Sequence, residues 1–180
     1  MIKLIDGRGK DNAWISARLN RPSQLSVTTE RKQVEEILSN IKGNGDQTVI
    51  EYTAEFDRVS YNCPKEMVVT QKEIEMAYDQ VDRRYLKIMQ RARKNIWEFH
   101  SKQLQNSWIT YGEDGVIMGQ NILPMERVGV YVPGGRAAYP SSVLMNIIPA
   151  KVAGVSEIIM VTPPGIDKRI NPHTLVAARE

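Results

Sequence analysis

Apolar residues at helical spacing predict helices over the first third of the chain. One such face is formed by Val34, Ile37, Leu38 and Ile41. Gly43 is expected to end this helix, because glycine takes the left-handed conformation that follows many helices without strain. Asp46 can cap a second helix by accepting hydrogen bonds from its free backbone amides. The apolar side of that helix would hold Val49, Tyr52 and Phe56, and we expect these helices to form one layer.

Two further helices are predicted between residues 70 and 105. Thr70 and Glu73 have the spacing of a capping box, in which each side chain accepts a hydrogen bond from the backbone amide of the other residue. A long helix follows from about Asp82 to Gln105, and its apolar residues are Tyr85, Leu86, Met89, Ala92, Ile96 and Phe99. Only Glu98 opposes its cations, which are Arg83, Arg84, Lys87, Arg91, Arg93, Lys94 and Lys102.

The pattern changes to that of strands after residue 107. Residues 108–111 and 116–118 flank Gly112-Glu113-Asp114-Gly115, a hairpin signal with glycine where positive φ is needed. From Glu126 the chain reads as strand, helix, strand and helix, over residues 127–132, 141–154, 157–162 and from Asn171-Pro172 onward. The continuous apolar run from Ile158 to Val161 is typical of a parallel strand that is buried on both faces.

These elements predict an α/β fold in two parts. An N-terminal helical segment with a β-hairpin would occupy residues 1–123, and residues 124–180 would form an incomplete Rossmann-like parallel sheet. Residues 174–180 have a helical pattern with no terminating glycine and no strand after it. We therefore expect the chain to be the N-terminal piece of a longer protein. Apolar surface left exposed on this piece would favour unspecific self-association.

Composition narrows the class of protein. A length of 180 residues with 42% hydrophobic and 25% charged residues fits a soluble globular protein of one domain or two small ones. The net charge of +3 is too small to imply a polyanionic partner. The single cysteine, Cys63, excludes an intrachain disulfide and a thiolate metal cluster, which favours a reducing intracellular compartment. No apolar run has the length of a signal peptide or a membrane span.

The strand-to-helix turn at residues 131–142 is a candidate binding loop. Ligands of open parallel sheets bind at the carboxyl ends of the strands. Pro133 fixes φ, Gly134 and Gly135 allow a ligand to approach the backbone, and Ser141 can cap the next helix. A plain tight turn explains the same residues equally well, because neither GxGxxG nor GxxxxGK[ST] is present.

A second loop, Thr162-Pro163-Pro164-Gly165, ends the other parallel strand and would lie beside the first turn. Its rigid prolines could form a wall for a flat aromatic group. The residues alone favour the alternative, which is a plain loop.

The remaining reactive side chains predict no catalytic or metal-binding set. His100 and His173 lie on separate predicted helices, whereas a catalytic zinc needs about three protein ligands. Each histidine is therefore interpreted as a surface residue. Cys63 has no neighbouring basic cluster that would activate its thiol.

The basic helix supports a rival hypothesis. Its cations could follow RNA phosphates, and the sheet edge could bind a nucleotide, which would make the chain a stand-alone nucleotide- or RNA-binding module. The aromatic residues Tyr85, Trp97 and Phe99, however, lie near helical core spacing, which favours packing over base stacking. A solvated helix face is the commoner outcome, so nucleic acid is not the expected partner.

The stretch ERVGVYVPGGRAAYPSSVLMN at residues 126–146, followed by IPAKVAGV at residues 148–155, resembles the histidinol dehydrogenase family. The likeness continues through residues 158–164 and 175–178. Upstream it includes GNGD at residues 43–46, Tyr52 and Phe56-Asp57. It therefore covers the entire chain as the N-terminal portion of the family.

The resemblance implies a zinc-dependent, NAD-linked enzyme of histidine biosynthesis, which oxidises L-histidinol through L-histidinal to L-histidine with two NAD. It also implies a cytoplasmic homodimer with two Rossmann-like domains. On the family's pattern Tyr131 contacts NAD, and Pro133, Pro163 and Phe56 are candidates for the cofactor wall. The family's acid-base glutamate and histidine, and its zinc ligands (a glutamine, an aspartate and two histidines), lie downstream of the match to Glu180. These 180 residues alone are therefore expected to be inactive.

Overall fold

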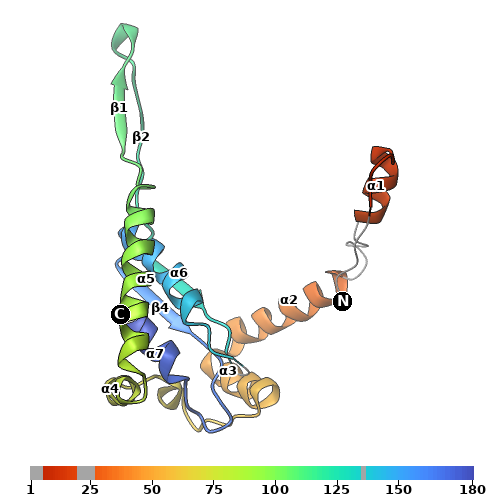
Figure 1. Ribbon diagram of the computed structural model, residues 1–180, viewed down its shortest axis with the longest axis vertical. Helices are drawn as coiled ribbons and strands as arrows, with labels where there is room; N and C mark the ends of the chain where they lie inside the picture. Colours follow the sequence, from red (N-terminus) through yellow and green to blue (C-terminus); the bar gives the residue numbers. More distant parts are fainter. Residues whose placement is uncertain (1–5, 20–26, 135–136) are drawn as a thin grey trace. The chain divides into compact units, whose positions relative to one another are not determined.

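The computed structural model describes residues 6–19, 27–134 and 137–180 (Figure 1). The chain divides into two compact units, Met1–Val49 and Ile50–Glu180, and each is described by itself. In the described part of the chain, the helices are either too short or too polar to cross a membrane.

The first unit is helical. It contains α1 (Asn12–Leu19), α2 (Val27–Asn44) and the first residues of α3 (Asp46–Tyr52). The prediction that Gly43 ends the helix is wrong, because α2 continues to Asn44 and Gly45 takes the positive φ of +66°. The predicted apolar layer is also incomplete, since the side chains of Val34 and Leu38 are 53% and 61% exposed.

The second unit opens with three short helical segments. The end of α3 leads into a π-helical turn, Thr53–Asp57, which stops at Arg58 with φ of +58°. A 3-10 turn, Pro64–Met67, precedes α4 (Gln71–Asp79).

Local hydrogen bonds fix where α4 and the long helix α5 (Arg83–Ser101) begin. The predicted capping box is confirmed: Glu73 N–H donates to Thr70 Oγ1 at 3.3 Å, and Thr70 N–H donates to Glu73 Oε2 at 2.7 Å. The Thr70 amide, together with the Thr70 hydroxyl that donates to Glu73 Oε2 at 2.7 Å, holds the pKa of Glu73 below its ordinary value. Asp82 caps α5 by accepting from Arg84 N–H at 2.6 Å.

Within the described residues, four strands form two separate sheets of two strands each. The predicted hairpin consists of β1 (Trp108–Tyr111) and β2 (Ile117–Gln120), which pair antiparallel across a 3-10 turn at Glu113–Gly115. The predicted β-α-β-α segment consists of β3 (Arg127–Tyr131), α6 (Pro140–Val152), β4 (Glu157–Val161) and α7 (Pro172–Arg179). Strands β3 and β4 are parallel, with Arg127 opposite Glu157 and Tyr131 opposite Val161. This is the α/β class expected from the sequence, with a sheet that is incomplete as a Rossmann-like fold.

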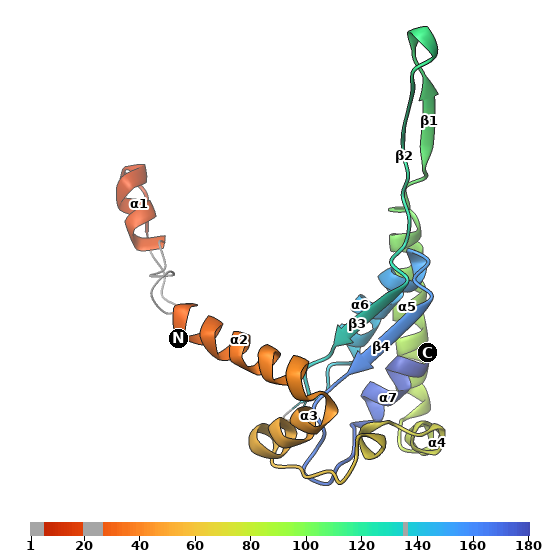
Figure 2. The ribbon, with the colours of Figure 1, turned by 180° about the vertical axis from the view of Figure 1, so that it is seen from behind.

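Helices cover one face of the β3–β4 sheet, as Figure 2 shows. The buried residues between the sheet and the helices are Met89, Val130, Val132, Val143, Leu144, Ile148 and Ala177. A second cluster joins α4 to α7 and contains Ala77, Val81, Leu175 and Val176. Burying a valine, leucine, isoleucine or methionine side chain completely stabilises the fold by about 1.5–3 kcal/mol relative to leaving it exposed.

The opposite face of the sheet is open among the described residues. Ile159 and Val161 are 47% and 55% exposed, and Tyr131 is 64% exposed. The expectation that residues 158–161 are buried on both faces is therefore wrong within this chain, because helices cover only one side. We call the residues Gly129, Tyr131, Ile159 and Val161 the open sheet face.

The compact second unit extends across the position where the sequence pattern placed a boundary, between residues 123 and 124. Helix α5 packs against α6, and α4 packs against α7. The division of the chain by compactness falls at residues 49 and 50 instead.

We expect Thr70→Ala to lower the free energy of unfolding by about 1 kcal/mol at neutral pH, because the first turn of α4 loses its cap. The Glu73 pKa is lowered in the fold, so its contribution is present above its ordinary value of 4.5 and is lost as pH falls through the folded value. Urea titrations at pH 7 and near pH 4 should therefore show a smaller effect of the substitution at the lower pH. Thr110→Ala, in the exposed strand β1, is the control and should change stability by less than about 0.5 kcal/mol.

Candidate functional site

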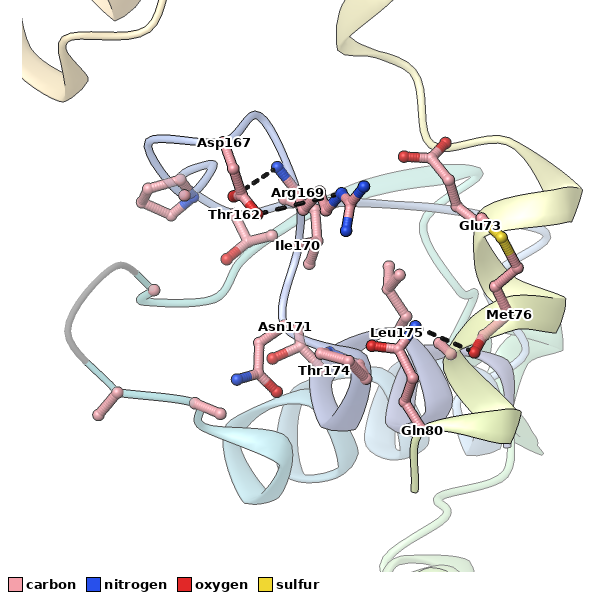
Figure 3. A pocket seen from close by; sticks show the side chains of 17 residues that line it. Glu73, Met76, Gln80, Thr162, Asp167, Arg169, Ile170, Asn171, Thr174 and Leu175 are labelled. Atoms are coloured by element: carbon pink, nitrogen blue, oxygen red, sulfur yellow. Dashed lines mark hydrogen bonds and ion pairs between the residues drawn. The ribbon is translucent and has the colours of Figure 1, made fainter. Parts of the chain in front are cut away.

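A cavity of about 440 Å³ lies at the carboxyl edge of the parallel sheet. Two loops leave the sheet at this edge, β3 to α6 and β4 to α7, and helix α4 forms the facing wall (Figure 3). The hydrogen-bonding side chains of its lining are Glu73, Gln80, Thr162, Asp167, Arg169, Asn171 and Thr174. This is the edge where open α/β sheets bind ligands.

Gly134 allows the two loops to touch. A Cβ at this position would lie 2.8 Å from Thr162 Oγ1 and 3.1 Å from the carbonyl oxygen of Pro163. The first distance is shorter than real Cβ contacts and the second is tighter than most of them, so a side chain here would require the Thr162 hydroxyl and the Pro163 backbone to shift. The absence of a Cβ at Gly134 therefore serves the contact with the neighbouring loop, and the approach of a ligand to this backbone stays a prediction. Gly135 lies outside the described residues.

The loop from β4 to α7 is a tight turn. Gly165 N–H donates to the Arg169 carbonyl at 2.9 Å, and Lys168 N–H donates to the Gly165 carbonyl at 2.9 Å. Asp167 Oδ1 accepts from Arg169 N–H at 3.1 Å. Lys168 occupies the left-handed region with φ of +64°. These bonds fix the loop that carries Asp167 and Arg169 beside the cavity.

The side chain of Lys168 ties this turn to the segment before α4. Its ammonium lies 3.7 Å from a carboxylate oxygen of Glu66 and 5.1 Å from the centre of the Tyr61 ring. Burial is the main reason that the pKa of Tyr61 is raised, and nearby carboxylates add to the effect. The turn is therefore held by its backbone hydrogen bonds and by the side-chain contacts of Lys168.

The starts of α6 and α7 differ in how they are capped. Asn171 Oδ1 accepts from His173 N–H at 2.9 Å, which confirms the predicted cap of α7. The prediction that Ser141 caps α6 is wrong, because the helix begins earlier, with Tyr139 at the cap and Pro140 in the first turn. Tyr139 makes no side-chain capping bond, and its carbonyl accepts from Ser142 N–H at 3.0 Å.

The structure separates the four residues that the family pattern assigned to NAD. Pro163 lines the cavity, directly after Thr162. Tyr131 ends β3 on the open sheet face, and Pro133 is exposed in the following loop. Phe56 stacks on Tyr52 with 5.3 Å between ring centres and is 59% exposed, outside the cavity lining.

Sequence reasoning missed the wall that α4 contributes. Glu73, Met76, Ala77 and Gln80 line the cavity because α4 packs on α7. The capping box located the start of α4, but no signal in the sequence showed which later element this helix would meet.

Helix α5 confirms one part of the packing prediction and corrects another. Tyr85 packs against the buried clusters, as predicted from its spacing. Trp97 and Phe99 are 44% and 61% exposed. Both were predicted to pack. At 100° per residue Trp97 falls about 100° from the centre of the buried stripe through Tyr85, Met89 and Ile96, whereas Phe99 lies only about 60° from it and is exposed near the C-terminal end of the helix.

The histidines and the cysteine lie apart. His100 Nδ1 is 2.6 Å from Gln103 Oε1, and the His173 ring meets the edge of Tyr85 with 4.5 Å between centres. Cys63 is exposed. Within residues 6–19, 27–134 and 137–180, no three His, Cys, Asp or Glu side chains are grouped so that they could hold a metal ion.

We expect Gly134→Ala to lower the free energy of unfolding by about 1–3 kcal/mol, because its Cβ would force Thr162 and Pro163 to move. Gly129→Ala is the matched control on the preceding strand, where a Cβ meets no atom within 4 Å. Its stability should be unchanged or raised by up to about 1 kcal/mol. Chemical denaturation of both variants decides the point, and equal stabilities would contradict the close contact at Gly134.

Comparisons with known proteins agree with the fold and identify the family. A family model described as histidinol dehydrogenase matches residues 20–180. Histidinol dehydrogenase of Bacillus subtilis (strain 168) is 48% identical over 162 residues, which are 90% of this chain and 37% of that protein. The enzyme of Thermosynechococcus vestitus (strain NIES-2133 / IAM M-273 / BP-1) is 45% identical over 180 residues, which are 100% of this chain and 42% of that protein.

A solved structure of a histidinol dehydrogenase also resembles this chain. The crystal structure of histidinol dehydrogenase from Elizabethkingia anophelis matches with a TM-score of 0.82 and 32% identity, over 94% of this chain and 38% of that one. The chain thus spans about two fifths of the length of these relatives. Since the family model matches most of its residues, the chain belongs to the histidinol dehydrogenase family.

Proposed function

We propose that the chain forms the NAD-side part of a zinc-dependent enzyme that oxidises L-histidinol through L-histidinal to L-histidine. The observation that carries this proposal is a cavity at the carboxyl ends of two parallel strands in a member of this family. The enzyme would belong to histidine biosynthesis and act on a small molecule. As a further part of the proposal, it works as a cytoplasmic homodimer.

The residues at this edge fit part of a dinucleotide. A volume of about 440 Å³ lies within the usual range of small-molecule sites, about 300–1,000 Å³. Amide and hydroxyl groups of Gln80, Asn171 and Thr174 provide hydrogen-bond partners in the lining. Tyr131 lies three residues before Gly134 and exposes 64% of its surface, so its ring is free to contact a flat group. NAD, when bound, accepts a hydride from the substrate.

Within the proposal, the candidate residues at this edge have different roles. Tyr131 contacts the cofactor through its ring, and Pro163 forms a rigid wall of the cavity. Of the four candidates only Pro163 lines the cavity, so the proposed contacts of Tyr131, Pro133 and Phe56 rest on the family's pattern. Gly134 keeps the two loops in contact, which holds the cavity walls at a fixed separation.

The zinc site of the proposed enzyme is not formed by the described residues. A catalytic zinc site needs about three protein ligands, and the described residues bring no such set together. The described residues therefore do not fit the metal. In the proposal, the ligands and the acid-base pair are contributed by residues of the family enzyme outside this stretch.

We expect Tyr131→Ala to weaken NAD binding by about tenfold, because stacking of a base on an aromatic ring contributes about 1–3 kcal/mol. Isothermal titration of the 180-residue chain with NAD measures the change. Tyr111→Ala removes a tyrosine that is 79% exposed on the hairpin and should leave NAD affinity unchanged. Equal losses in the two variants, or no binding of NAD by the parent chain, would contradict the assignment.

We also expect the purified 180 residues to produce no NADH from L-histidinol and NAD, with or without added zinc. Removal of the alcohol proton needs a positioned base, and the proposal assigns that base to another part of the enzyme. The absorbance of NADH over time is the readout, with a full-length family member as the positive control. Zinc-dependent NADH formation by the chain itself would overturn this division of roles.

A further inference from the structure

Two walls of the cavity at the sheet edge come from different parts of the chain. The loop from β4 to α7 contributes Asp167 and Arg169, and α4 contributes Glu73 and Met76 (Figure 3). Helices α4 and α7 are joined through a buried apolar cluster, but residues 163–169 of the loop do not belong to it. A fixed spacing between this part of the loop and α4 therefore depends on other contacts.

Lys168 supplies such a contact from outside the cavity. It lies in the turn of the loop but does not line the cavity. Its ammonium is 3.7 Å from Glu66 Oε2 and 5.1 Å from the centre of the Tyr61 ring. Glu66 belongs to the 3-10 turn that leads to Thr70, the cap of α4. Among the described residues, no other ion pair joins the loop to this segment.

The carboxylate that Lys168 meets is already held in place. Asn62 N–H donates to Glu66 Oε2 at 3.1 Å, and Asn62 Nδ2 donates to Glu66 Oε1 at 3.0 Å. These hydrogen bonds are the main reason that the pKa of Glu66 is lowered, and the charge of Lys168 adds to the effect. Glu66 is therefore ionised at neutral pH and fixed in orientation, so that pairing orders only the lysine side chain.

The backbone of Lys168 is in a conformation that other residues adopt more easily. Its φ of +64° lies in the left-handed region, which glycine and asparagine enter at lower cost than lysine. The turn by itself would therefore form at least as well with glycine at this position. What lysine adds is the contact of its ammonium with Glu66 and Tyr61.

We propose that Lys168 is a positioning residue, which sets the spacing of the two cavity walls by tying the β4–α7 loop to the segment before α4. The inference rests on the proposed function in taking NAD as the ligand of this cavity. Without the tie, the loop spends part of its time displaced from α4, and the apparent affinity falls with the fraction of molecules whose loop is in place. Because Lys168 and Glu66 are partly exposed, the expected effect is several-fold.

Isothermal titration of the 180-residue chain with NAD tests the effect on affinity. Lys168→Met removes the charge and keeps an unbranched side chain, and it should raise the dissociation constant about three- to tenfold. Lys168→Arg keeps the cation and should stay within about twofold of the parent. Arg127→Met is the matched control, because it removes a cation paired with Glu157 at 2.6 Å where β3 and β4 begin. It should leave NAD affinity unchanged.

Two further variants separate the ion pair from the backbone. Glu66→Gln should weaken NAD binding as Lys168→Met does, and the double variant should be little worse than either, because each change alone removes the pair. Lys168→Gly relieves the backbone and removes the side chain. It should keep or raise the free energy of unfolding and still weaken NAD binding, a combination that a merely structural role would not produce. Full additivity in the double variant would contradict the tie.

Amide hydrogen exchange tests the restraint without any ligand. Gly165 N–H donates to the Arg169 carbonyl at 2.9 Å and closes the turn. By NMR, Lys168→Met should speed exchange of this amide at least about threefold, and Arg127→Met should not. Unchanged exchange in Lys168→Met, or NAD affinity equal to that of the parent, overturns the inference and leaves NAD binding itself standing. If the parent binds no NAD, the proposed function fails, and exchange alone decides whether Lys168 restrains the loop.

Discussion

Burial of α6 against the parallel sheet is the interaction on which the rest of the second unit depends. Parallel strands cannot be joined by a tight turn, so the link from β3 to β4 is a long crossover, which in this chain contains α6. Val143, Leu144 and Ile148 bury one side of that helix against Val130 and Val132 of the first strand and its extension. The crossover brings both strand ends to the same edge. The two loops that form the cavity meet there for that reason.

The same helix also explains why α4, α5 and α7 join one compact unit. Met89 of α5 and Ala177 of α7 belong to the cluster that surrounds α6. Helix α7 then carries Leu175 and Val176 into the second cluster with α4. The hydroxyl of Tyr78 donates to Glu180 Oε1 at 3.1 Å, which adds a polar contact between α4 and the end of the chain. The cavity wall made by α4 is therefore held indirectly, through α7, by the packing of α6.

Local signals in the sequence predicted the helices and strands well. They predicted poorly how these elements pack on one another. Thr70 with Glu73, and Asn171 with Pro172, specify helix starts through bonds made within a few residues, so their prediction needed no knowledge of the tertiary structure. It was harder to predict which faces of the sheet the helices would cover. The run from Ile158 to Val161 is apolar throughout, but helices cover only one of its faces. Apolarity shows that a surface can be buried, and the arrangement of other elements decides whether it is.

The candidate site shows the same limit. The glycine at position 134 suggested close approach to a ligand, whereas its near neighbours are Thr162 and Pro163 of the adjacent loop. Spacing alone cannot distinguish these two uses, because both require only that no Cβ be present. The distinction has a physical consequence: a glycine that packs two loops together contributes to stability before any ligand arrives. Under the proposed function, affinity at this edge depends on side chains such as that of Tyr131, which is 64% exposed at the end of β3. The proposal thus assigns stability to Gly134 and cofactor binding to Tyr131, so substitutions at the two positions are expected to separate the two properties.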